Sequence, residues 1–186
     1  MVTLTPAPGV TFQIPQNWIA CDDATEKLLT SAHDPLSLHD KICNADPGVP
    51  VQLRAFDPRP FRNVSILFNH FDHQVLSSDA LNAFTPDDMK AGNSAMCDAA
   101  TKALKETTKI ASCNAGLGLL ATKRAIVVAI VEIVPAQDVP NPKILVTSYE
   151  LPYSQGYLQL QISYPEMFQQ NVLPEVNAVL NSVQIQ

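Results

Sequence analysis

Charged side chains are scarce in this 186-residue sequence: they make up 16% of it, against about a quarter in an average soluble domain. Basic residues are the scarcer kind, 12 against 18 acidic ones, which leaves a net charge of −6. Lys123-Arg124 is the only adjacent basic pair, so no stripe of cations is present to neutralise a row of phosphates. The sequence therefore argues against nucleic acid as a partner.

Long apolar runs are also missing. The longest, residues 125–134, contains Glu132 and has the length of a strand, so no membrane span is predicted. The first residues, Met1 to Pro6, have neither the basic patch nor the apolar segment of a secretory signal. We expect either a cytosolic protein or a mature form from which a signal has been removed.

Motifs that carry catalytic chemistry are few. The sequence has no Gly-x-Ser-x-Gly elbow, the turn that presents a nucleophilic serine. Gly116-Leu-Gly118 has no third glycine and does not open a helix, so it does not predict a phosphate-binding loop. No catalytic residue is identified and no cofactor is expected. A protein without catalytic activity is therefore favoured over an enzyme.

The sharpest local feature is the segment from Asn69 to His73, directly after a predicted strand. Its imidazole and carboxylate groups suit zinc or another divalent ion. Polar loops also gather histidine and aspartate for reasons of turn formation alone. We predict no metal, and keep His70, Asp72 and His73 as the candidate ligands of the alternative, a small metal-dependent or hydrolytic enzyme. In that alternative Glu132 takes part, or else the loop of residues 33–40, which has two more His-Asp pairs.

Hydrophobic periodicity predicts an α+β fold class in a single domain, residues 1–186, with residues 1–9 as an irregular lead-in. Short links between strands imply one antiparallel β-sheet of about five to seven strands flanked by helices, with residues 125–134 as a central strand. Residues 114–118 are predicted as a turn. The predicted strands are residues 10–15, 51–56, 64–68, 125–134, 144–151 and 157–163. The predicted helices are residues 22–32, 79–84 and 86–107, and a C-terminal helix whose main part begins at Pro174.

The two ends of the sequence resemble the PsbP-like (Mog-type) α/β/α sandwich. The resemblance rests on Gly9-Val-Thr-Phe-Gln-Ile-Pro15 with Trp18, and on a closing strand with Leu158, Leu160 and Ile162 before a last helix. Members of that fold include photosystem extrinsic subunits, a nuclear-transport factor and exported bacterial proteins of unknown role. The resemblance implies an exported binding or assembly module with another protein as its partner. No functional residue is carried over, because no functional motif matches.

Four cysteines allow three disulfide pairings. We expect the local one, Cys21 with Cys43 and Cys97 with Cys113. The first bond would hold down residues 33–43, which have little apolar content, and the second would hold the chain as it folds back along the predicted helix. The alternative is four buried reduced thiols, since free cysteine is often buried. Disulfides imply an oxidising compartment, and so an extracytoplasmic (periplasmic or secreted) location.

Overall fold

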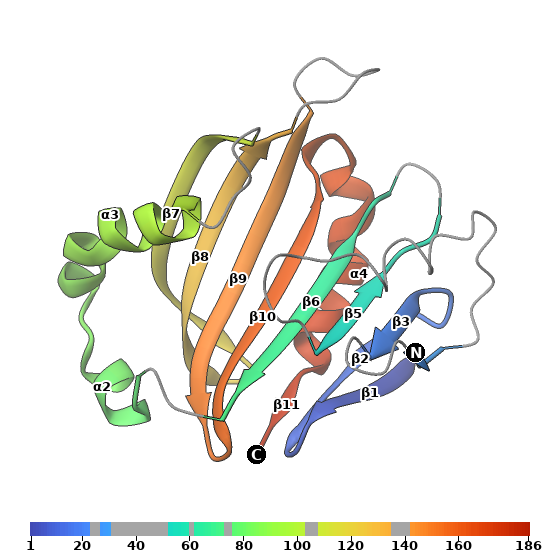
Figure 1. The fold of residues 1–186 in the computed structure, drawn as a ribbon, viewed down its shortest axis with the longest axis horizontal. Helices are drawn as coiled ribbons and strands as arrows, with labels where there is room; N and C mark the ends of the chain where they lie inside the picture. The colour runs from blue at the N-terminus through green and yellow to red at the C-terminus, as the bar shows by residue number, and fades with distance from the viewer. Residues whose placement is uncertain (23–26, 31–51, 60–61, 73–75, 103–107, 135–141) are drawn as a thin grey trace.

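A computed structural model of the protein describes residues 1–22, 27–30, 52–59, 62–72, 76–102, 108–134 and 142–186 (Figure 1). Its strands form two antiparallel sheets. The main sheet has the spatial order β4 (Lys27–Leu28), β3 (Ile19–Asp22), β5 (Leu53–Phe56), β6 (Ser65–Phe71), β10 (Gly156–Pro165), β9 (Lys143–Tyr153), β8 (Lys123–Ile133) and β7 (Lys109–Leu120). The small sheet consists of β1 (Val2–Ala7), β2 (Val10–Ile14) and β11 (Gln184–Ile185). The helices are α2 (Ser78–Ala83), α3 (Pro86–Lys102) and α4 (Gln169–Ser182), and a 3-10 turn, η1 (Glu166–Phe168), precedes α4.

The core lies between the main sheet and α4. Alternation along β10 sends Leu158, Leu160 and Ile162 to this face, and all three are almost fully buried. Leu160 lies opposite Phe68 of β6 and Tyr149 of β9, so neighbouring strands place apolar side chains on the same face. Burying this face removes apolar surface from water, which is the main force that holds α4 against the sheet.

Helix α4 closes that core, behind β6 and β10 in Figure 1. Val172, Val176 and Val179 follow helical spacing and are buried. Pro174 does not begin the main part of the helix, as the sequence predicted, but lies inside it. The helix starts earlier because η1 continues directly into it and Val172 anchors its first turn in the core.

Helix α3 lies on the opposite face of the sheet, at its β7 edge. Its start is the predicted one: the backbone N–H of Asp88 donates to Thr85 Oγ1 at 3.2 Å, and the N–H of Thr85 donates to Asp88 Oδ2 at 2.8 Å. The hydrogen bonds from Thr85 lower the pKa of Asp88. Asn93 Oδ1 accepts the outward-facing N–H of Ala115 at 2.6 Å, so the helix covers part of an otherwise open sheet edge.

The predicted α+β class with an antiparallel sheet is confirmed, and the strand content is larger than expected. The main sheet has eight strands instead of five to seven, and the small sheet was not predicted. Residues 1–9 are not an irregular lead-in, because Val2–Ala7 pairs with β2. Residues 114–118 are not a turn but the middle of β7, paired along its length with β8.

Two predicted helices differ from the structure in part. In place of the helix predicted over residues 22–32, Asp22 ends β3 and Lys27–Leu28 pairs with it as β4; the rest of that range lies outside the described residues. The helix predicted over residues 86–107 is present as Pro86–Lys102, and residues 103–107 lie outside the described part. The strand predicted at residues 125–134 is interior, between β7 and β9, although it is only the second strand from the edge.

Two glycines on β7 allow a matched test of how closely its neighbour packs. A Cβ at Gly118 would lie 2.6 Å from Cγ2 of Val127, whereas a Cβ at Gly116 would meet nothing within 4 Å. Because the β-branched Val127 has few alternative rotamers, we expect Gly118→Ala to cost about 1 to 3 kcal/mol of unfolding free energy. Gly116→Ala is the control and should stay within about 0.5 kcal/mol. Urea denaturation of both variants checks this, and equal stabilities would contradict it.

Candidate functional site

The segment predicted as a possible metal loop is mostly a strand. Asn69, His70 and Phe71 belong to β6, so their side chains alternate between the two faces of the sheet. His70 Nδ1 lies 3.7 Å from Asp72 Oδ1, and the Asp72 side chain is almost fully exposed. His73 and the loop of residues 33–40 lie outside the described residues. Within the described residues, no three His, Cys, Asp or Glu side chains lie together as a metal site would require.

His70 instead helps to hold the end of β6. Its Nε2 lies 3.1 Å from the carbonyl oxygen of Gln155, and its ring meets that of Tyr153 edge-on at 5.7 Å. The Gln52 side chain pairs with the His70 backbone: its amide donates to the carbonyl and its Oε1 accepts the N–H. The contacts of the His70 ring join β6 to the β9–β10 turn. The Gln52 side chain lengthens the hydrogen-bonded pairing between β5 and β6 by one residue.

Asn69 points to the other face of the sheet and begins a row of polar side chains. Its Nδ2 donates to Gln159 Oε1 at 3.0 Å, and Gln159 Nε2 donates to Glu150 Oε1 at 2.9 Å. The Tyr157 hydroxyl lies 3.4 Å from Glu150 Oε2. Burial, and secondly the charge of Glu150, raise the pKa of Tyr157. The row joins β6, β10 and β9 across one face and satisfies its own polar groups.

Glu132 does not meet His70. Glu132 lies near the end of β8, opposite Ile110 of β7 and Ile144 of β9, on the α3 side of the sheet. Burial among these neighbours raises its pKa, although the side chain remains partly exposed. His70 lies on β6, which β9 and β10 separate from β8, and its side chain is on the α4 side. The described residues therefore do not assemble the site in which Glu132 and His70 would act together.

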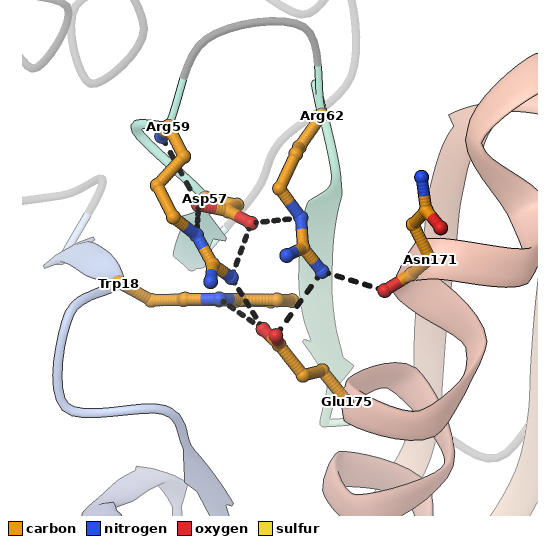
Figure 2. Close-up of polar contacts among 6 residues, drawn as sticks. All are labelled: Trp18, Asp57, Arg59, Arg62, Asn171 and Glu175. Atoms are coloured by element: carbon orange, nitrogen blue, oxygen red, sulfur yellow. Dashed lines mark hydrogen bonds and ion pairs between the residues drawn. The ribbon is translucent and has the colours of Figure 1, made fainter.

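The strongest cluster of charges joins the β5–β6 loop to α4 (Figure 2). The two oxygens of the Asp57 carboxylate accept hydrogen bonds from Nε and Nη2 of Arg59, each at 2.7 Å. Nε of Arg62 lies 3.0 Å from Asp57 Oδ2 as an ion pair. Glu175 of α4 receives Nη2 of Arg59 at 2.5 Å and Nη2 of Arg62 at 3.1 Å. The Trp18 indole N–H donates to the same Glu175 carboxylate at 3.2 Å. We call this set the clasp.

The clasp is balanced in charge, and hydrogen bonds join each arginine to at least one of its carboxylates, while Nε of Arg62 contacts Asp57 as an ion pair only. Asp57 has no exposed side-chain surface, whereas 36% of the Arg59 side chain is exposed. The hydrogen bond to Asp57 raises the pKa of Arg59. Two carboxylates and two guanidinium groups leave no net charge to attract a ligand, so the arrangement suits fixing α4 to the sheet better than binding.

The cysteines bear out the predicted pairing where the structure describes both partners. Cys97 of α3 and Cys113 of β7 form a disulfide, with an S–S distance of 2.07 Å and Cα atoms 5.8 Å apart. Cys21 is buried in β3 and is also disulfide-bonded. Cys43, its predicted partner, lies outside the described residues, so that pairing stays a prediction. The Cys97–Cys113 bond fastens α3 to the edge strand that the helix covers.

A half-exposed apolar surface remains on the α4 side of the sheet. Helix α4 covers β10 and reaches β2, while Val127, Ala129 and Val131 of β8 are half-exposed or exposed. Val127 lies between Gly116 of β7 and Tyr149 of β9. We call these five residues the open face. Next to it is a cavity of about 370 Å³, lined by Leu119, Leu120, Ala121, Thr122, Tyr149, Asn177, Leu180 and Asn181.

One end of the open face is bordered by lysines. Lys109 of β7 and Lys143 of β9 lie on either side of Ile133, the last residue of β8. Lys143 forms an exposed ion pair with Glu166 at 3.4 Å, which contributes little in water. Lys109 is exposed and forms no ion pair within the described residues. The surface is therefore apolar along β8 and positive at its end.

Comparisons with known proteins concern the fold. No protein-family model and no curated protein sequence matches the chain. The fold is similar to the solution structure of cyanobacterial PsbP (CyanoP) from Synechocystis sp. PCC 6803, with a TM-score of 0.45 and 14% identity over 96% of this chain and 87% of that one. It is also similar to LpqN, involved in cell envelope biogenesis of Mycobacterium tuberculosis, with a TM-score of 0.47 and 8% identity over 100% and 90%. The likeness to PsbP that the sequence indicated is found in the fold, and at these identities it extends to the fold alone.

The helices were compared with the length and hydropathy of a membrane span. Among the described residues, no helix has both the length and the apolar character needed to cross a bilayer.

Proposed function

We propose that the chain is an exported, non-catalytic binding module that holds another protein on the open face of β8. The observation that carries this proposal is the half-exposed row Val127, Ala129 and Val131 beside α4. A sheet face of this kind is normally covered by a second layer. Gly116 at the edge leaves space above the sheet, so a partner backbone can approach closely.

The chemistry of the surface selects the kind of partner. An amphipathic helix lying beside α4 would place its apolar side on β8. Lys109 and Lys143 at one end favour acidic residues at the matching end of that helix, because complementary charges fix the direction of binding. The proposed partner is therefore an amphipathic helix with an acidic end.

Export is supported by the cysteines. The Cys97–Cys113 disulfide and the disulfide-bonded Cys21 are the state expected in an oxidising compartment, because cytosolic thiols are kept reduced. The Cys97–Cys113 bond also holds α3, much of which is exposed, against β7, which suits a protein that acts outside the cell.

A photo-crosslinking amino acid at Ala129, introduced into the protein in its own cells, tests the binding surface. We expect an adduct from Ala129, which is exposed on the open face, and none from Ala95, which is exposed on α3. Charge reversal, Lys109→Glu, should reduce the Ala129 adduct severalfold, because the acidic end of the partner would then be repelled. Equal adducts from both positions, or an Ala129 adduct unaffected by Lys109→Glu, would refute the proposal.

A further inference from the structure

A second cavity lies at the β7–β8 turn, and none of the five open-face residues lines it. It has a volume of about 440 Å³, within the range of small-molecule sites. Three segments enclose it: the short helix α2, the β7–β8 turn with the start of β8, and the β9–β10 turn. Its lining residues are Ser78, Leu81, Asn82, Thr122, Lys123, Arg124, Pro152, Tyr153 and Ser154. We call it the α2 pocket.

The charge of the α2 pocket is opposite to that of the protein. The described residues that line it include two cations, Lys123 and Arg124, and no carboxylate, although the chain has 18 acidic residues and a net charge of −6. Neither cation forms an ion pair within the described residues. Lys123-Arg124 is also the only adjacent basic pair of the sequence. The two charges are thus concentrated in one hollow and are not neutralised there by the described carboxylates.

Arg124 is held in a fixed position. Its Nη1 donates to the carbonyl oxygen of Asn82 at 2.9 Å, and its Nη2 donates to that of Phe84 at 2.5 Å. Both carbonyls belong to the C-terminal end of α2, which a cation stabilises. Carbonyl dipoles orient a guanidinium group without cancelling its full charge, so Arg124 remains a source of positive potential for the pocket.

Lys123 is placed by an unusual turn. Ala121 and Thr122 both have left-handed backbone conformations, with φ of 51° and 66°. Two-residue hairpin turns of this kind normally use asparagine and glycine, because other residues are strained there. The strain is retained at a turn that supplies Thr122, Lys123 and Arg124 to one cavity, which points to a role for these side chains beyond closing the hairpin.

The rest of the lining is partly apolar. Leu81, Pro152 and Tyr153 are buried residues of the lining, and Ser78 and Thr122 are lining residues that carry hydroxyl groups. Such a mixture fits a ligand with an anionic group at one end and an apolar group at the other.

From this geometry we infer that the α2 pocket binds a small organic anion, in which a carboxylate or phosphate group contacts Lys123 and Arg124 and an apolar group lies against Leu81 and Tyr153. Carboxylate and phosphate groups both accept charge-assisted hydrogen bonds from lysine and arginine. This site is separate from the open face, so it goes beyond the proposed function and does not rest on it.

Titration calorimetry with four probes that share a benzene ring tests the inference on the full chain. Benzoate and phenyl phosphate carry the two anionic groups, benzyl alcohol carries no charge, and benzylamine is a cation. We expect one or both anions to bind, with a Kd below about 10 mM, and the neutral and cationic probes to bind at least about tenfold more weakly. The anion that binds more tightly identifies the class of ligand. Equal binding of benzylamine, or no binding of either anion, overturns the inference.

A matched pair of variants locates the site. Lys123→Gln removes a charge that lines the pocket, and Lys102→Gln removes one from the exposed end of α3. We expect Lys123→Gln to weaken anion binding about tenfold or more, because a charge-assisted hydrogen bond is lost, and Lys102→Gln to leave it unchanged. Backbone amide shifts from NMR confirm that each variant is folded, and anion binding should shift the amides of residues 78–82 and 122–124. Equal binding by the two variants would exclude the α2 pocket. The variant Lys109→Glu, which borders the open face, should bind the anion normally, and this separates the test from that of the proposed function.

Discussion

Replacing Asp57 with alanine is expected to destabilise the protein by about 3 kcal/mol, the low end of the cost of removing one partner from a buried ion pair, because both arginines keep some contact with water. The Asp57 side chain is fully buried and receives hydrogen bonds or ion pairs from both Arg59 and Arg62. Without it, the two guanidinium groups would share only Glu175, which is partly exposed on α4. Repulsion between them would add to the loss of the contacts that join the β5–β6 loop to the helix. Urea denaturation followed by Trp18 fluorescence measures the change, because the indole contacts the same cluster.

The control for Asp57→Ala is Glu166→Gln. Glu166 also pairs with a cation, Lys143, but both side chains are about half exposed, at 45% and 46%. Exposed pairs contribute about 0 to 1 kcal/mol, so this variant should unfold close to the parent protein. Similar stabilities for the two variants would show that the clasp does not hold α4 to the sheet.

Removing the Cys97–Cys113 disulfide is the second large effect expected. The bond joins residues 16 apart, and loops of about this length contribute roughly 3 kcal/mol when closed. The double variant Cys97→Ser, Cys113→Ser should lose about that amount, measured by urea denaturation of both proteins without reductant. The bond also fastens α3 to the β7 edge, so the loss should be concentrated there.

Hydrogen exchange shows where the stability is lost. In the double variant, amides of α3 and the Ala115 amide, which donates to Asn93, should exchange faster relative to the parent than those of β10. The single variant Asn93→Ala is the control, since it removes the side-chain contact and keeps the covalent bond. If the double variant unfolds at the parent's urea midpoint, the disulfide contributes nothing to holding α3.

Local features of the fold could be predicted from the sequence. Thr85, Pro86 and Asp88 specify the start of α3 by residue type alone, and the structure shows that cap. The alternation of Leu158, Leu160 and Ile162 gave β10 its buried face. In both cases the pattern lies within a few neighbouring residues, and it does not depend on which element of the fold packs against them.

Strand β7 was missed because its glycines imitate a turn. Gly116 and Gly118 suggested a loop, whereas the real turn, at Ala121 and Thr122, contains no glycine, asparagine or proline. In the pairing with β8, Gly118 lies opposite Ala125 and close to the Val127 side chain, so the glycine is needed for strand packing and not for bending. Tertiary contacts decided the meaning of a residue that is ambiguous on its own.

Side-chain sites also depend on tertiary contacts that the local sequence pattern does not predict. Asn69 and His70 are adjacent in sequence, but the strand sends them to opposite faces, so their proximity did not make a metal site. Arg59 and Glu175 are 116 residues apart and meet directly. Such a contact depends on how α4 packs against the β5–β6 loop, and no local pattern in the sequence records it.

The state of the cysteines in the living cell tests the central claim, an exported binding module, most directly. Cells that produce the full-length protein are quenched in acid, denatured without reductant and treated with a thiol-reactive reagent, and the labelled thiols per chain are counted by mass spectrometry. An exported protein should carry no labelled thiol, with a peptide that links Cys97 to Cys113. The same chain retained in the cytosol should carry four labelled thiols and serves as the control. Four labelled thiols in the protein made by its own cells would contradict export, and with it the proposed function.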